Sequence, residues 1–160
     1  MAEPTLRFRC LDAIRASLAG IVEGLPADDP YSIAFSAVEH GPLGDFDNRK
    51  RYVAAIVPGS ESKQTRYPLT DCTLPATIEF RMTVNRGDRR PAIEAERVLG
   101  EIQRRIAEDR TLGGLALDVR ETGNDLDLDT HADKAIEGAV FLEMRYRHAT
   151  DNPRAASQID

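Results

Sequence analysis

Hydrophobic positions along the chain repeat with a helical period in two stretches. Between residues 6 and 25, apolar side chains recur every three or four positions, which is the spacing of one face of a helix. A second stretch with this spacing begins near Pro91 and runs to about Asp109. Asp88 lies just upstream of it and is a candidate for the helix N-cap. The pattern therefore predicts two amphipathic helices far apart in the sequence.

Strand-like patterns occupy much of the remaining chain. They cover residues 31–38, 52–57, 78–84, 115–119 and 140–148, where apolar side chains alternate with polar ones or form a short run. The pair Gly123-Asn124 is of the kind that forms hairpin turns. Residues 64–74 are ambiguous because Pro68 and Pro75 interrupt them, and proline is confined to sheet edges and strand starts. We expect an edge strand or an irregular extended arm there.

The order of these elements predicts an α+β fold. Alternation within the strands indicates that one face of the sheet is covered and the other is freer. We expect a single antiparallel or mixed sheet with the two amphipathic helices packed on one face, and a long β-hairpin loop or arm. The domain should span residues 1–148, with a loop over 39–50 and the arm over 59–75. Residues 149–160 show no period and are expected to form a flexible tail.

Composition and charge exclude several classes of protein. The chain has 160 residues, of which 41% are hydrophobic, enough for one domain with a real core. Its net charge of −6 disfavours binding to nucleic acid through phosphate contacts. No apolar stretch is long enough to span a bilayer, and no signal-peptide pattern is visible, so we expect no membrane partner. Cys10 and Cys72 could pair, but two free thiols in a reducing compartment are the commoner case.

One acidic stretch resembles part of a calcium-binding loop. Asp125, Asp127 and Asp129 match the first three ligand positions of such a loop. The loop also requires a glycine at its sixth position and a carboxylate at its twelfth, where this chain has Thr130 and Ile136. The aspartates alternate with leucines, which fits a strand with one solvated face equally well. A small calcium-binding module is therefore a remote alternative to an acidic surface.

The sequence contains no arrangement typical of a catalytic centre. His40, His131 and His148 lie at no metal-ligand spacing, and Cys72 has no histidine near it in the sequence. The pair Gly113-Gly114 lies between a helix and a strand, so it caps the helix rather than binding phosphate. We expect no enzyme and no cofactor, and a small hydrolase is kept as a second alternative.

Charge is distributed unevenly along the chain. Residues 81–110 hold eight arginines and six acidic residues, whereas residues 118–133 hold six acidic residues and one arginine. One domain with two differently charged ends is the simpler interpretation. A head-to-tail contact between copies, basic surface against acidic surface, is the other. The candidate interface residues are Arg89, Arg90, Arg104, Arg105, Asp125, Asp127, Asp129 and Asp133.

The segment 109–119, Asp-Arg-Thr-Leu-Gly-Gly-Leu-Ala-Leu-Asp-Val, resembles a known family. It is similar to the stretch after the second helix in tail terminator proteins of long-tailed bacteriophages, and in related neck proteins that join head to tail. An amphipathic N-terminal helix, a strand over 78–84 and a final strand ending in Tyr146-Arg-His148 follow the same order. The polar segment Asp151-Asn-Pro-Arg154 is similar to the ending of that family. The resemblance covers most of residues 5–154.

The resemblance implies a structural virion protein that is assembled in the bacterial host cytoplasm and becomes part of the tail or neck. Members of the family form a ring, expected here to be a hexamer, on the finished tail tube, where they stop tube polymerisation and offer the surface to which the head docks. The implied partners are further copies of the chain, the tail tube protein and a head–tail connector or stopper protein, with DNA only passing through the ring. The alternative is a head-completion or tail-to-head joining protein of the same neck. The family brings no catalytic residues, and ring closure is expected to pair the arginines of the second helix with the acidic stretch.

Overall fold

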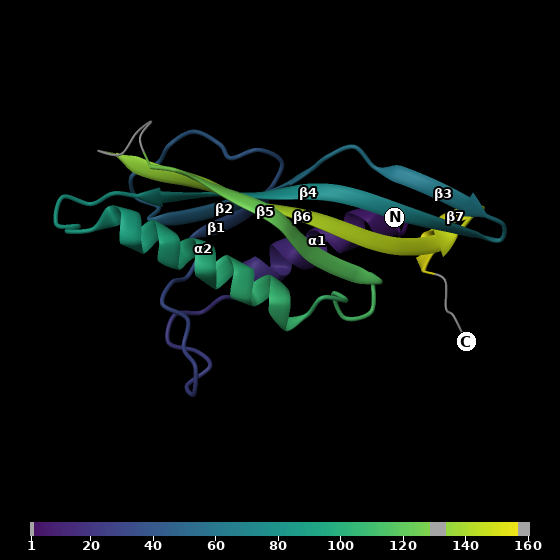
Figure 1. Cartoon of the computed structure of the whole chain (residues 1–160), viewed down its shortest axis with the longest axis horizontal. Helices are drawn as coiled ribbons and strands as arrows, with labels where there is room; N and C mark the ends of the chain where they lie inside the picture. Colours follow the sequence, from purple (N-terminus) through teal and green to yellow (C-terminus); the bar gives the residue numbers. More distant parts are fainter. Residues whose placement is uncertain (1, 129–133, 157–160) are drawn as a thin grey trace.

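A computed structural model, which describes residues 2–128 and 134–156, contains two helices on one face of a curled sheet (Figure 1). The seven strands of this sheet run in the order β1-β2-β4-β6-β5, with β3 paired to β4 and β7 paired to β6. All described pairs are antiparallel except β1 with β2. The elements are α1 (Leu6–Ala19), β1 (Ala37–His40), β2 (Tyr52–Pro58), β3 (Ser62–Arg66), β4 (Leu69–Thr83), α2 (Pro91–Glu108), β5 (Asp118–Asp127), β6 (Ala135–Ala149) and β7 (Asn152–Ala156). The predicted α+β fold, a mixed sheet with two helices, is confirmed.

The centre of the sheet consists of β4 and β6, which are 15 residues each and pair along their whole length. Successive side chains of a strand point to opposite faces, so every second residue lies beneath the helices. Ile78 and Phe80 of β4 and Val140 and Met144 of β6 are fully buried in this way. The residues between them face the open side and are mostly polar. The sheet therefore has one apolar face under the helices and one polar face.

A proline lies in the middle of β4 without breaking it. The carbonyl oxygen of Pro75 accepts a hydrogen bond of 2.7 Å from the amide of Gly59, in the link between β2 and β3. The N–H and C=O positions of one residue in an antiparallel ladder point to the same neighbouring strand. The donor that Pro75 lacks therefore faces this link, where no ladder partner requires it. The arm predicted over 59–75 is β3 paired with the first half of β4.

Two predicted features near the ends of strands differ from the structure. The pair Gly123-Asn124 does not turn the chain but lies inside β5, next to a bulge that follows Glu121. Glycine suits this place because the Phe141 ring packs there, 3.5 Å from where a Cβ of Gly123 would lie. At the C-terminus, residues 152–156 form β7 rather than part of a tail. Backbone hydrogen bonds to β6 hold this segment as a strand, and such pairing does not require an alternation of apolar and polar side chains.

The segment between α1 and β2 also differs from its prediction. A strand was expected over 31–38, but the only described strand in this region is β1, from Ala37 to His40. Tyr31 and Ile33 are buried as alternation predicts, yet they belong to an irregular segment. The amide of Ser32 donates to the Glu101 carboxylate of α2, 3.2 Å away, in place of a ladder bond. Alternate burial therefore arises here outside any named strand, with an isolated bridge between Tyr31 and Glu23.

Both predicted helices are present, but α1 ends at Ala19 rather than near residue 25, and Val22 and Leu25 beyond it are exposed. In α2 the buried side chains are Ala95, Val98, Leu99, Ile102 and Ile106, and in α1 they are Leu6, Cys10, Leu11, Ile14 and Leu18. Thr5 caps α1 by accepting a hydrogen bond from the Phe8 amide, whereas Arg90, at the N-cap position of α2, makes no side-chain capping hydrogen bond. Among the described residues, no helix combines the length and the apolar character needed to cross a membrane.

Candidate assembly surfaces

The four candidate arginines lie at the two ends of α2. Arg89 and Arg90 precede its first residue, and Arg104 and Arg105 lie in its last turns. A rise of about 1.5 Å per residue separates the two pairs by about 20 Å. The four side chains therefore do not form one basic patch, although they belong to the same helix.

Arg104 and Arg105 are used within the chain. The Arg104 guanidinium lies over the Tyr31 ring, 4.1 Å from its centroid, and donates to the carbonyl of Asp29 at 2.6 Å. Arg105 donates to the carbonyl of Ser17 at 2.9 Å and pairs with Glu108 at 3.1 Å. The Tyr31 hydroxyl donates to the same Glu108 carboxylate at 2.6 Å, and this hydrogen bond lowers the Glu108 pKa. These contacts attach the segment that follows α1 to the end of α2.

A second basic cluster stands at the other end of α2. Arg86, Arg89 and Arg90 are exposed and belong to the turn that connects β4 to the helix. None of the three has an ion pair or side-chain hydrogen bond to any residue that the structure describes. Arg89 and Arg90, but not Arg86, border a hollow of about 630 Å³, whose lining also includes Arg51, Asp88, Ile93, Glu94 and Arg97. We call Arg86, Arg89, Arg90 and Ile93 the arginine turn.

The arginine turn is held by Asp88, the residue that was predicted to cap α2. Its carboxylate instead accepts two hydrogen bonds from Arg51, at 3.1 and 3.3 Å, and one from the Asn85 amide at 2.7 Å. The Arg51 hydrogen bond is the main cause that lowers the pKa of Asp88. Asp88 therefore fixes the backbone from which the arginines project, and leaves the start of α2 uncapped.

Replacing Asp88 by asparagine is expected to lower the free energy of unfolding by about 1 kcal/mol at pH 7, since charge-assisted hydrogen bonds are lost. Because the folded-state pKa lies below the unfolded value, the stabilisation is complete above the unfolded pKa, near 4, and is lost as the pH falls through the folded value. Urea unfolding of the wild type and of the Asp88→Asn variant from pH 7 to pH 3 measures the difference in their free energies of unfolding. The difference should shrink below pH 4; an equal difference at all pH values would contradict the assignment.

The acidic candidates lie on the open face of the sheet. Asp125 and Asp127 are exposed on the outer side of β5 and border a hollow of about 320 Å³. The charged or apolar side chains around this hollow include Leu43, Glu79, Arg81, Asp125, Asp127 and Glu137. Arg81 pairs with Glu137 at 2.8 Å, so carboxylates outnumber cations there. We call this the acidic hollow. Asp129 and Asp133, the other acidic candidates, lie outside the described residues.

The calcium hypothesis depends on a loop, but the first part of the acidic stretch is a strand. β5 is extended through Asp125 and Asp127, so the two carboxylates lie on the same face about 7 Å apart along the backbone. Ligands of a calcium loop instead converge on one point. The alternation with leucine is thus that of a strand with one solvated face, while Asp129 and Thr130 lie outside the described residues.

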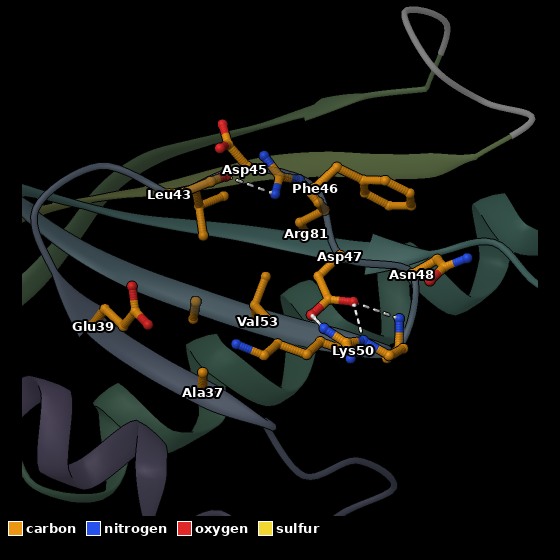
Figure 2. Close-up of a pocket in the computed structure, with 13 residues that line it drawn as sticks. Ala37, Glu39, Leu43, Asp45, Phe46, Asp47, Asn48, Lys50, Val53 and Arg81 are labelled. Atoms are coloured by element: carbon orange, nitrogen blue, oxygen red, sulfur yellow. Dashed lines mark hydrogen bonds and ion pairs between the residues drawn. The ribbon is translucent and has the colours of Figure 1, made fainter.

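A larger hollow, which sequence reasoning missed, lies beneath residues 41–50 on the open face. It measures about 770 Å³, with Ala37 and Val53 on its floor and Lys50 and Asp47 at its rim (Figure 2). Two residues of β4 hold the loop over the sheet: Arg81 donates to the Gly44 carbonyl at 3.0 Å and Glu79 accepts from the Leu43 amide at 3.1 Å. The sequence signal for this loop was only a run of Gly, Pro and Asp, which predicts a turn but no position.

The residues with potential chemistry are mostly packed in the core. Cys10 and Cys72 are buried and form no disulfide, and burial raises the pKa of Cys10 to about 12. His148 is buried as expected for the inward register of β6, and its Nδ1 lies 2.6 Å from the Ala149 carbonyl oxygen. Within the described ranges, no group of three His, Cys, Asp or Glu side chains is arranged to hold a metal ion. A thiol with so high a pKa is protonated at neutral pH and is a poor nucleophile.

Comparison with known proteins identifies no family for this chain. No family model matches the chain. No curated protein matches it either. Among solved structures, the sheath/tube terminator of an extracellular contractile injection system (PVC, extended state) aligns over 100% of this chain at 8% identity, with a TM-score of 0.47. This chain covers 63% of that protein, less than two thirds of its length. Similarity at this level is too weak to assign a fold family or a function.

Proposed function

We propose that the chain is a tail terminator: a structural subunit that closes into a ring, expected to be a hexamer, on the end of a tail tube, stops its growth and provides the surface for head docking. The proposal of a ring rests on one observation. In the part of the chain that the structure describes, a basic surface without ion pairs lies on the helix side and an acidic surface lies on the open sheet face. Because the two surfaces are different, copies that join through them repeat head to tail and close into a ring when the rotation allows.

The identity of the ring as a tail component rests on the sequence resemblance. The segment 109–119 that carries it forms the reversal from α2 to β5, in which Leu112, Gly113 and Gly114 all have positive φ angles. The Asp109 carboxylate accepts hydrogen bonds from the amides of Thr111 and Gly113, at 3.2 and 2.8 Å. The residues of the motif thus have a structural role in this chain. A head-completion or joining protein of the same neck is the alternative, and it would share the ring.

A tube-capping experiment distinguishes a tail terminator from a head-completion or joining protein. Purified protein carrying a gold-binding tag is added to the polymerising tube protein of the same assembly and viewed by negative stain. A terminator is expected to label one end of each tube and to shorten tubes as its concentration rises. Label along the tube wall, or tubes of unchanged length without label, would contradict the proposal. Label at tube ends without any effect on length would favour the joining protein.

A further inference from the structure

The positive charges of the arginine turn lie where the dipole of α2 disfavours positive charge. Arg89 and Arg90 stand at the N-terminal end of α2, which carries the positive end of the helix dipole and has no side-chain cap. Other arginines show the contrast: Arg51, Arg81 and Arg147, for example, each pair with a carboxylate on a neighbouring strand or turn. Arg86, Arg89 and Arg90 have no partner among the residues that the structure describes, so they form a surface that gains by meeting carboxylates from another molecule.

An apolar side chain accompanies these arginines. Ile93, in the first turn of α2, is 49% exposed, whereas Ile102 and Ile106 of the same helix are buried. Arg97, one turn further on, is paired with Glu94 at 3.2 Å and so adds little free charge. The arginine turn thus combines three cations, unpaired within residues 2–128 and 134–156, with one apolar contact, the composition of a small protein-binding surface.

The acidic hollow has the complementary composition. Asp125, Asp127, Glu79 and Glu137 surround it, with Arg81 as the cation among the described residues that line it. Leu43 of the loop over the open face and Ala139 of β6 add apolar surface. Basic side chains from outside would therefore find carboxylates around an apolar floor.

The two surfaces lie on opposite sides of the sheet. Asp125 pairs in register with Ala139 on the side of the sheet away from the helices, whereas the arginine turn leads into α2 on the helix side. Figure 1 shows the turn before α2 and the end of β5 at the same end of the molecule, with α2 beneath the sheet and residues 41–50 above it. Resting on the proposed ring, we infer that the arginine turn of one copy docks in the acidic hollow of the next copy.

This inference revises the composition of the predicted contact. It retains Arg89, Arg90, Asp125 and Asp127 from the candidate residues. It replaces Arg104 and Arg105, which are engaged within the chain, by Arg86 and Ile93. The helix layer of one copy then covers part of the open sheet face of its neighbour. Duplex nucleic acid is the other class of ligand that exposed arginines attract, and binding to it is one outcome of the test.

A charge-swap experiment tests the contact. Variant A carries Arg89→Glu and Arg90→Glu, variant B carries Asp125→Arg, and the control carries Arg66→Glu, an exposed arginine of β3 far from the turn. Light scattering measures the protein concentration at which each assembles. A and B alone are expected to need at least about tenfold more protein than wild type, whereas the control behaves as wild type. A ring that alternates A and B pairs opposite charges at every contact, so an equimolar mixture is expected to assemble better than either variant alone. A double variant carrying both sets of changes is the second rescue, expected within about threefold of wild type.

The outcomes separate the contact from the function. If wild type forms rings and neither variant weakens them, the contact is wrong and the ring stands. If both weaken assembly but the double variant does not recover, the residues do not face each other and the contact is also wrong. A wild type that never self-associates, alone or on a tube, overturns both proposals. Binding of wild type, but not variant A, to duplex DNA without an effect on assembly would show that the turn is a nucleic-acid surface, and would overturn the contact.

Discussion

Replacing Gly138 by alanine is expected to lower the free energy of unfolding by about 3 kcal/mol, or to prevent folding. Gly138 lies in β6 with its missing side chain directed at the core. An added Cβ would lie 2.4 Å from Cζ of Phe80 and 2.8 Å from Cδ2 of Leu126. Phe80 is fully buried in the centre of the sheet, so its ring has no free space to enter. Overpacking of a dense core typically costs about 1–3 kcal/mol, and a contact this short lies at the upper end.

A second glycine provides the control. Gly100 lies in the middle of α2, and a Cβ added there would meet no atom within 4 Å. The Gly100→Ala variant should therefore gain stability, by about 0.5–1 kcal/mol, because alanine favours a helix interior. Urea unfolding followed by circular dichroism measures both variants. Equal stability of Gly138→Ala and wild type would mean that the Phe80 ring does not pack against β6 as described.

Replacing Ile102 by alanine is expected to lower the free energy of unfolding by about 2–5 kcal/mol. Ile102 is fully buried where α2 packs on the sheet, and the change removes apolar surface and leaves a cavity. Ile93 on the same helix is 49% exposed, so Ile93→Ala should change stability by less than about 0.5 kcal/mol. The two variants remove the same atoms from the same helix, and urea unfolding compares them directly.

The same pair of variants separates stability from assembly. Ile93→Ala is expected to fold as wild type and to weaken self-association, because Ile93 belongs to the arginine turn. Ile102→Ala, studied at low denaturant where it remains folded, should assemble normally. Normal assembly of Ile93→Ala would remove the apolar contact from the inferred interface. A large loss of stability in Ile93→Ala would instead show that its side chain is part of the core.

The spacing of apolar residues in the sequence was enough to predict which side chains of α2 and β6 are buried. The helical spacing of Val98, Ile102 and Ile106 and the alternation over residues 140–148 both follow from one apolar layer between helices and sheet. Side chains that face this layer recur at the helical period in a helix and at every second residue in a strand. The spacing of apolar residues in the sequence therefore shows which side chains form the core. Pro75 obscured β4, because proline disfavours a central strand and only the tertiary structure shows that its missing donor faces a gap.

The candidate surfaces were less predictable. Arg90 and Arg104 look equivalent in the sequence, as basic residues near the ends of one helix. Their roles differ because the fold brings Tyr31 and Asp29 beneath Arg104, from about 75 residues away in the sequence, whereas no described carboxylate pairs with Arg90. Charge composition cannot distinguish an arginine that is neutralised inside the chain from one that is free. That distinction depends on which loops fold onto the helix.

The central claim is that copies of this chain join head to tail into a closed ring. Light scattering after size exclusion, with negative-stain imaging of the same fractions, tests it most directly over a wide range of protein concentration and in the presence of polymerised tube. The account predicts rings of about six copies of the 17.7 kDa chain, favoured by high concentration or by the tube and weakened by salt. A two-fold dimer that grows no further, or a monomer under every condition, would contradict it.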